Sequence, residues 1–215
     1  MTSEIPEDSR DEEVNSANVE EFKPSLAISI VWNVLGTILV FVGLLLFSLI
    51  YGEIGDGSLA GSSYVESTGE EDEFTVTVGL GGMLPVVILI VGVLLAHEAI
   101  HGVAFWWYGG RPKFGAALVQ KILPVLYCTA PGYRFTRSQF SVIVLAPLVL
   151  ISMAGIVMMP FVGYGALLVV PLALNFAGAI GDIWMFGMLM VRPANVMIED
   201  LKDGLRFHYP ATSVR

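Results

Sequence analysis

Three residues that together can bind and use a metal ion lie within five positions of the chain. His97 and His101 are four residues apart, and Glu98 directly follows the first. On a helix this spacing puts both imidazoles on one face, in reach of one metal ion, with the carboxylate beside its open position. Zinc in such a site acidifies a bound water, whose proton a carboxylate can pass to a leaving amine. The pattern predicts zinc on His97 and His101, with Glu98 as general base.

A third metal ligand is needed, because a catalytic zinc usually has three protein ligands and a water. Between Phe74 and Ile198 the only acidic residues are Glu98 and Asp182, so we predict Asp182 as that ligand. We expect the helices that contain His101 and Asp182 to run in the same direction across the membrane. With a rise of about 1.5 Å per residue, His101 lies roughly 10 Å and Asp182 roughly 12–15 Å from the cytoplasmic end of its helix, so the two depths agree. Asn175, seven residues before Asp182 on the same expected helix face, is the candidate for holding substrate or stabilising an oxyanion.

Four long apolar segments must position these residues. The chain is 55% hydrophobic and only 14% charged, which is far more apolar than a soluble domain. The segments 26–50, 84–107, 140–161 and 166–190 are each long enough to cross a membrane as a helix. Two short apolar stretches, 114–120 and 123–128, have the Gly and Pro punctuation of a β-hairpin. We therefore expect an all-α membrane protein with about four transmembrane helices and a short hairpin between the second and third.

The segments outside the expected membrane domain of residues 25–192 differ in charge. Residues 1–24 are acidic and poor in apolar side chains, which predicts a disordered tail. The loop 51–77 has no Lys or Arg, whereas the loop 109–139 has five and the segment 193–215 has three, Lys202, Arg206 and Arg215. Because basic residues favour the cytoplasmic side, we expect a multi-pass protein of the cell membrane with both termini, including the C-terminal segment 193–215, in the cytoplasm.

Composition also argues against other functions. The net charge is −9, and no basic domain is present, so nucleic acid is not an expected partner. A single cysteine, Cys128, allows neither an intrachain disulfide nor a cysteine-rich zinc finger. The expected partners are the lipid bilayer and a membrane protein or peptide substrate, and the sequence does not indicate an oligomeric state.

Residues 80–190 resemble the zincin-type membrane peptidases and, more distantly, the site-two-type intramembrane zinc metalloproteases. The resemblance is carried by His97-Glu98-Ala99-Ile100-His101-Gly102, by Ala146-Pro147 and by the segment from Asn175 to Asp182. In site-two-type enzymes an aspartate of a later helix is the third zinc ligand, which implies that role for Asp182. There it stands in Leu-Asp-Gly after an Asn-Pro motif, whereas here Ile183 follows Asp182 and Phe176 follows Asn175. Those enzymes cut substrates unwound into a strand, which the hairpin could pair with.

Three readings of the intramembrane polar residues stay open at this point. The first is a membrane-embedded zinc metalloprotease that hydrolyses peptide bonds near the cytoplasmic side. The second is a small transporter or ion- or proton-conducting component in which Glu98 and Asp182 relay charge. The third is a non-catalytic zinc-binding scaffold, or a metal-free cluster in which the same side chains bond to one another. The rarity of charged groups at such depths and the His-Glu-x-x-His spacing favour the first reading.

Overall fold

The computed structural model describes residues 18–55, 80–119, 123–161 and 165–210. The chain divides into two compact units, whose boundaries pass through long helices. One, the sheet unit, comprises the residues up to Ile30, Ile100–Leu145 and the residues from Asp182 onward. The other, the helical unit, comprises Val31–Ala99 and Ala146–Gly181.

Four helical segments are long and apolar enough to cross a membrane. They are α2 (Leu26–Ile54), residues Leu84–Trp107 of α3 (Leu80–Trp107), α4 (Arg137–Met158) and the stretch Gly165–Met190. Large apolar side chains along them, such as Phe41 and Leu45 of α2, are more than half exposed. Such a surface suits hydrocarbon, where a helix also satisfies its own backbone polar groups. The predicted class, a four-span helical protein with a hairpin after the second span, is confirmed.

The last spanning segment is not the single helix expected over 166–190. It consists of a short 3-10 helix, η1 (Gly165–Leu168), then α5 (Val169–Gly178) and α6 (Ile180–Met190). The interruption at Ala179 is flanked by Gly178 and Gly181, and glycine is among the poorest helix formers. Asn175 and Asp182 therefore lie on two consecutive helices, α5 and α6, rather than on one continuous helix. Asp182 lies instead in the first turn of α6.

Small residues allow close helix packing inside the helical unit. A Cβ atom built on Gly43 of α2 would lie 3.0 Å from the Cα atom of Ala173 in α5. Ala173 itself is fully buried. Contacts of this kind bring helix backbones together and are the usual way in which membrane helices associate. The position therefore admits glycine, whereas a larger side chain would push the two helices apart.

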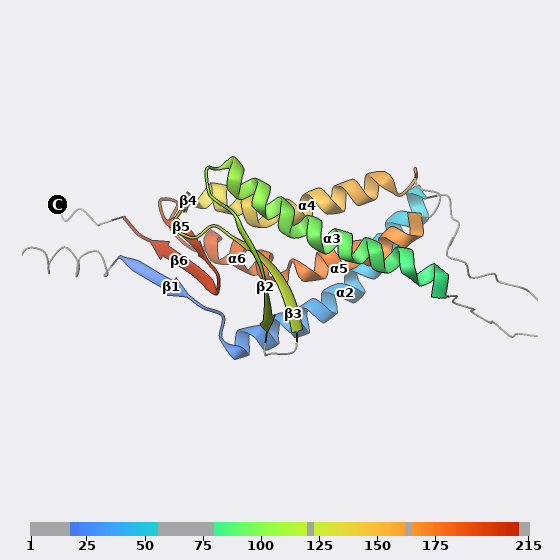
Figure 1. Ribbon diagram of the computed structural model, residues 1–215, viewed down its shortest axis with the longest axis horizontal. Coiled ribbons are helices and arrows are strands. Elements are labelled where there is room, and N and C mark those ends of the chain that lie inside the picture. The colour runs from blue at the N-terminus through green and yellow to red at the C-terminus, as the bar shows by residue number, and fades with distance from the viewer. Residues whose placement is uncertain (1–17, 56–79, 120–122, 162–164, 211–215) are drawn as a thin grey trace, which may run out of the picture. The chain divides into compact units, whose positions relative to one another are not determined.

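A four-stranded antiparallel sheet, which the sequence analysis missed, forms much of the sheet unit. The strands are β1 (Val19–Phe22), β4 (Arg134–Thr136), β5 (Met197–Leu201) and β6 (Gly204–His208), in the order β1-β6-β5-β4 (Figure 1). The predicted disordered tail of residues 1–24 therefore includes a strand near its end, while residues 1–17 lie outside the described part. The C-terminal segment is likewise a hairpin rather than a plain extension. Only their alternating polarity could have indicated these strands.

One face of this sheet covers an apolar core. Ile198 of β5, Leu205 and Phe207 of β6 and Phe135 of β4 are buried with Phe105, Phe140 and other apolar residues of the unit. Ile198 pairs with Phe207 and with Phe135 in the register of the sheet, so these side chains share a face. Since strand residues two apart face the same side, Asp200 also points toward the core face, where a carboxyl group is unusual.

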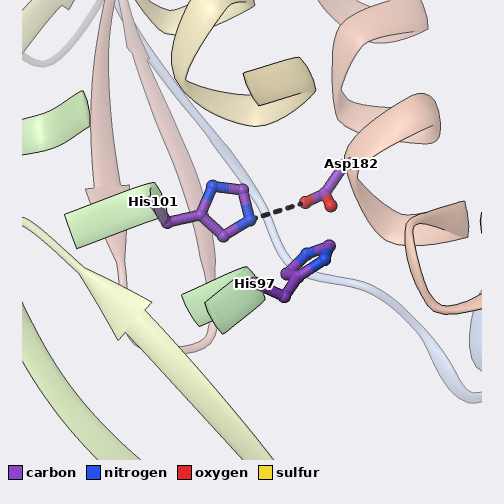
Figure 2. Close-up of side chains that lie close together, drawn as sticks. All are labelled: His97, His101 and Asp182. Carbon is purple, nitrogen blue, oxygen red and sulfur yellow. Dashed lines mark ion pairs between the residues drawn. The ribbon is translucent and has the colours of Figure 1, made fainter. Parts of the chain in front are cut away.

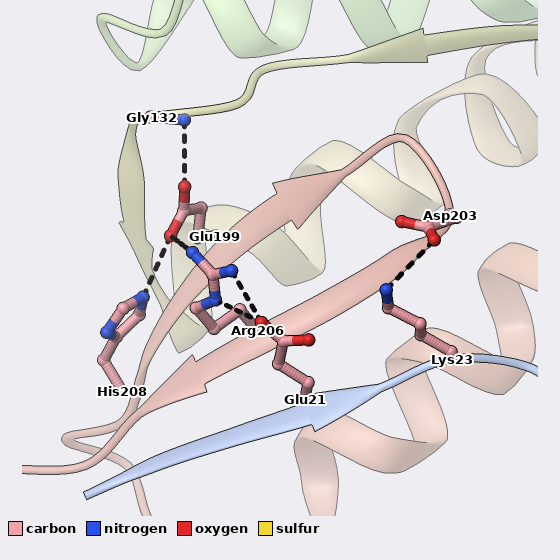
Figure 3. Close-up of polar contacts among 7 residues, drawn as sticks. All are labelled: Glu21, Lys23, Gly132, Glu199, Asp203, Arg206 and His208. Atoms are coloured by element: carbon pink, nitrogen blue, oxygen red, sulfur yellow. Dashed lines mark hydrogen bonds and ion pairs between the residues drawn. The ribbon is translucent and has the colours of Figure 1, made fainter. Parts of the chain in front are cut away.

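The opposite face holds a polar network that fastens β1 to the sheet (Figure 3). Arg206 donates to Glu21 of β1 at 2.6 Å and to Glu199 of β5 at 3.3 Å. Glu199 also accepts from the backbone N–H of Gly132 at 3.0 Å and lies 3.1 Å from His208. Burial raises the pKa of Glu199, but the bonds from His208, Gly132 and Arg206 outweigh it, so the pKa lies below its ordinary 4.5. Glu199 therefore joins three parts of the sheet unit while charged.

The predicted hairpin is confirmed as a separate two-stranded antiparallel sheet. Its strands are β2 (Lys113–Val119) and β3 (Leu123–Thr129), each within one residue of the expected bounds. Thr129, at the end of β3, places its hydroxyl oxygen 3.2 Å from the backbone carbonyl oxygen of Asp200. The end of the hairpin is thus bonded to the four-stranded sheet within the same unit.

Candidate metal centre

The two histidines and the aspartate predicted as metal ligands lie together (Figure 2). His97 and His101 occupy successive turns of α3, so the helix itself fixes their spacing. Nε2 of His101 lies 3.5 Å from a carboxylate oxygen of Asp182, and both side chains are buried. One potential ligand atom from each of the three residues lies within 4.8 Å of the others. Two histidine nitrogens and one carboxylate oxygen thus form a group that could hold a metal ion.

This donor set fits a zinc ion. Zinc takes imidazole nitrogen and carboxylate oxygen, and three protein ligands leave a fourth tetrahedral position for water or substrate. Ligand atoms about 2.1 Å from a tetrahedral zinc lie about 3.4 Å from one another. The separation of 3.5 Å between His101 and Asp182 is close to that value and too long for a strong hydrogen bond. A carboxylate in the first turn of α6 is also favoured by the positive end of the helix dipole.

Each histidine has a neighbour that orients its ring. Nδ1 of His101 lies 3.0 Å from the backbone carbonyl oxygen of Ile143 in α4, which can only accept a hydrogen bond. Nδ1 of His97 lies 3.0 Å from the side-chain oxygen of Asn175 in α5. If both Nδ1 atoms carry the proton, both Nε2 atoms keep a lone pair for a metal ion. Such outer contacts orient the ligands of metal sites and fix their tautomers.

The other two predicted site residues lie beside this group. Glu98 follows His97 on α3 and is partly buried, and it is not one of the three residues whose ligand atoms converge. This position agrees with a carboxylate that transfers protons and does not coordinate the metal. Asn175 is only 2% exposed and contacts His97 directly, a contact that the sequence spacing did not indicate.

Comparison with known proteins adds a family to this geometry. Residues 89–197, just over half of the chain, match the model of a family described as "Putative zincin peptidase". The chain belongs to this family. No curated protein and no solved structure matches the chain. The matched range contains both histidines, Glu98, Asn175 and Asp182. Membership of a zincin family supports metallopeptidase chemistry in general and zinc as the metal.

The protein also has a buried acidic residue that the sequence analysis overlooked. Burial raises the pKa of the Asp200 carboxyl from its ordinary 3.8 to about 7. The Thr129 side chain, the Ala130 backbone and the charge of His101 act in the opposite direction, while the charge of Asp182 adds to the rise. Asp200 is therefore close enough to His101 and Asp182 for their charges to affect its pKa. The signal in the sequence was a carboxyl two residues after Ile198 on a strand face that is otherwise apolar.

The residue after the second histidine of the motif lets the hairpin approach this group of residues. Gly102 follows His101 on α3, and a Cβ atom built there would overlap the aromatic ring of Phe114 in β2. Phe114 is otherwise largely exposed. Glycine at this position therefore allows the first strand of the hairpin to lie directly against the helix beside a metal ligand.

Proposed function

We propose that this protein is a membrane-embedded zinc metalloprotease of the His-Glu-x-x-His type. The proposal rests on one observation above all: ligand atoms of His97, His101 and Asp182 lie within 4.8 Å of one another, in helices long and apolar enough to cross a membrane. The family match supports the same chemistry.

In this proposal some residues bind the metal ion and another transfers protons. A zinc ion on His97, His101 and Asp182 would polarise a peptide carbonyl and lower the pKa of a water molecule to about 7. Glu98, one residue after His97 on the same helix, accepts the proton of the attacking water and later donates it to the amine that leaves. The burial of His101, Asp182 and Asn175 lowers the local dielectric constant and so strengthens the electrostatic interactions of these groups.

Asn175 is proposed to serve both the metal ligand and the substrate. Its side-chain oxygen is used by His97, while its Nδ2 atom is buried and has no hydrogen-bond partner among the described residues. A buried donor without a partner carries a free-energy cost, which a substrate carbonyl or its oxyanion would remove. This arrangement supports the substrate-holding role that the sequence suggested, reached through a different contact.

The substrate is proposed to be a membrane protein or peptide that is cut near the cytoplasmic side, with both termini of the enzyme in the cytoplasm of a cell. The distribution of Lys and Arg supports this orientation. The hairpin of β2 and β3 is a two-stranded sheet that lies against α3 at Gly102, next to His101. A substrate segment pulled out of its helix could pair with a strand edge there while its peptide bond enters the site.

The test compares the purified wild type with Glu98→Gln and His97→Ala, each in detergent and in lipid vesicles. Bound zinc is measured by elemental analysis, and newly formed peptide ends are measured by mass spectrometry on membranes of cells that make each form. We expect the wild type and Glu98→Gln to bind about one zinc each, and His97→Ala to bind much less. New peptide ends should appear only with the wild type.

The control is Glu53→Gln, the same chemical change at an exposed residue near the end of α2. It should leave both zinc content and cleavage unchanged. A wild type without zinc would contradict the proposal and favour a transporter or a metal-free cluster. Zinc with equal peptide ends in the wild type and Glu98→Gln would favour a non-catalytic scaffold.

A further inference from the structure

The carbonyl that orients His101 comes from the middle of a helix, where carbonyls are normally occupied. Ile143 lies in the interior of α4, and its carbonyl would ordinarily accept the N–H of the residue four positions later. Nδ1 of His101 is nevertheless 3.0 Å from this oxygen, and both residues are buried. The bond therefore draws on an acceptor that an unbroken helix would already use.

The residue four positions later is Pro147, which has no backbone N–H. The missing donor leaves the Ile143 carbonyl without its usual helical partner. The proline ring also crowds the carbonyl four residues before it, which tilts that carbonyl outward from the helix. Both effects favour a donor from outside α4, and the imidazole of His101 is in place to provide it.

We infer that Pro147 is a positioning residue of the metal site. By withholding a backbone N–H from the Ile143 carbonyl, it leaves that oxygen to His101, whose Nδ1 then carries the proton and whose Nε2, on the side of Asp182, is the nitrogen that can bind a metal ion. The inference depends on the proposed function in one respect: it assumes that the ion bound by Nε2 of His101 is zinc. It gives the Ala146-Pro147 pair, which lies apart from the metal ligands in sequence, a specific part in the chemistry.

The experiment uses the full chain in detergent and the variant Pro147→Ala. The chain has three histidines, so ¹⁵N-histidine labelling gives few imidazole signals, which single substitutions at His97 and His208 can assign. In the metal-free wild type we expect His101 to hold its proton on Nδ1. In Pro147→Ala the new N–H of residue 147 competes for the Ile143 carbonyl, so we expect a mixture of tautomers. Zinc affinity, measured by competition with a chelator, should fall roughly 10- to 100-fold.

Thermal stability separates this role from a general structural one. Removing a proline from a helix interior restores a backbone hydrogen bond, so the metal-free Pro147→Ala should melt at the same temperature as the wild type or higher. A variant that becomes more stable while it loses zinc affinity cannot owe the loss to damaged folding. The matched control is Pro85→Ala, which removes the proline inside α3, three turns before His97. It should change neither the tautomer of His101 nor the zinc affinity.

Each outcome bears on one proposal. Equal tautomers and equal zinc affinities in the wild type and Pro147→Ala would overturn the role of Pro147 while leaving the zinc site intact, because a carbonyl can accept two hydrogen bonds. A wild type that binds no zinc contradicts the proposed function, and the tautomer comparison in metal-free protein still decides the role of Pro147. If Pro147→Ala does not fold, the wild type alone suffices, since a proton on Nε2 of His101 overturns the inference.

Discussion

Replacing Asp200 by Asn should change how the stability of the metal-free protein depends on pH. Asp200 points to the core face of the sheet, and burial raises the pKa of its carboxyl to about 7 from 3.8. The folded state therefore binds this proton more tightly than the unfolded state does. The stabilising effect of the proton is complete below about pH 4 and is lost as the pH rises through about 7.

The size of the effect follows from the shift. A difference of about 3 pKa units corresponds to about 4 kcal/mol of unfolding free energy, of which about 3 kcal/mol is lost between pH 5 and pH 8. An asparagine carries no such proton. It leaves a buried amide group that costs about 1–3 kcal/mol at every pH. Relative to the wild type, Asp200→Asn should thus gain about 3 kcal/mol from pH 5 to pH 8, or roughly 6–12 °C in melting temperature.

The assay is thermal unfolding in detergent with a chelator present, followed by tryptophan fluorescence at several pH values. The quantity of interest is the difference between variant and wild type, because contributions from the other titrating groups cancel in it. Asp203→Asn is the matched control, since Asp203 is exposed in the same hairpin and forms a surface ion pair with Lys23 at 3.1 Å. Its difference should stay near zero. A constant difference for Asp200→Asn from pH 5 to pH 8 would refute the reasoning about burial.

Two further predictions concern the packing of each unit. Gly43→Ala should destabilise the protein by about 1–3 kcal/mol, because the added methyl group meets the backbone of Ala173. Gly52→Ala in the same helix has open space around it and should stabilise the protein by about 0.5–1 kcal/mol. Thermal unfolding measures both effects. Equal effects at the two glycines would contradict the close packing. Glu199→Gln should destabilise the sheet at neutral pH, because the charged Glu199 is stabilised by its hydrogen bonds and its pKa is lowered. The difference in stability between the variant and the wild type should shrink as the pH falls below about 4.5. Hydrogen exchange of the β1 amides can measure this difference.

The apolar helices and the proximity of His97, His101 and Asp182 could be predicted because both follow from simple rules. A run of more than twenty apolar residues has few stable alternatives to a membrane helix, and four were found. The spacing of His97 and His101 determines their shared helix face, and the scarcity of other acidic residues in the spans pointed to Asp182. These three residues do converge in the structure.

The four-stranded sheet was missed because no single segment indicates it. β1 has four residues and β4 three, and both are stabilised mainly by pairing with the C-terminal hairpin. Strand stability of this kind comes from distant partners, so the acidic composition around Glu20 and Glu21 suggested a disordered segment instead. Asp200 escaped notice for the same reason, since its unusual position is defined only by the face of a strand that had not been predicted.

The breaks in helical regularity coincide with the residues that hold the metal ligands. Pro147 removes a donor from α4 and leaves the Ile143 carbonyl to His101, and the interruption at Ala179 starts a new helix whose first turn contains Asp182. A proline in a helix interior and a helix break within a membrane each leave backbone groups without partners, which is costly in hydrocarbon. Features that oppose the local preference of a chain are expected at functional sites. In this protein the irregular helix positions, together with the His-Glu-x-x-His spacing, mark the site.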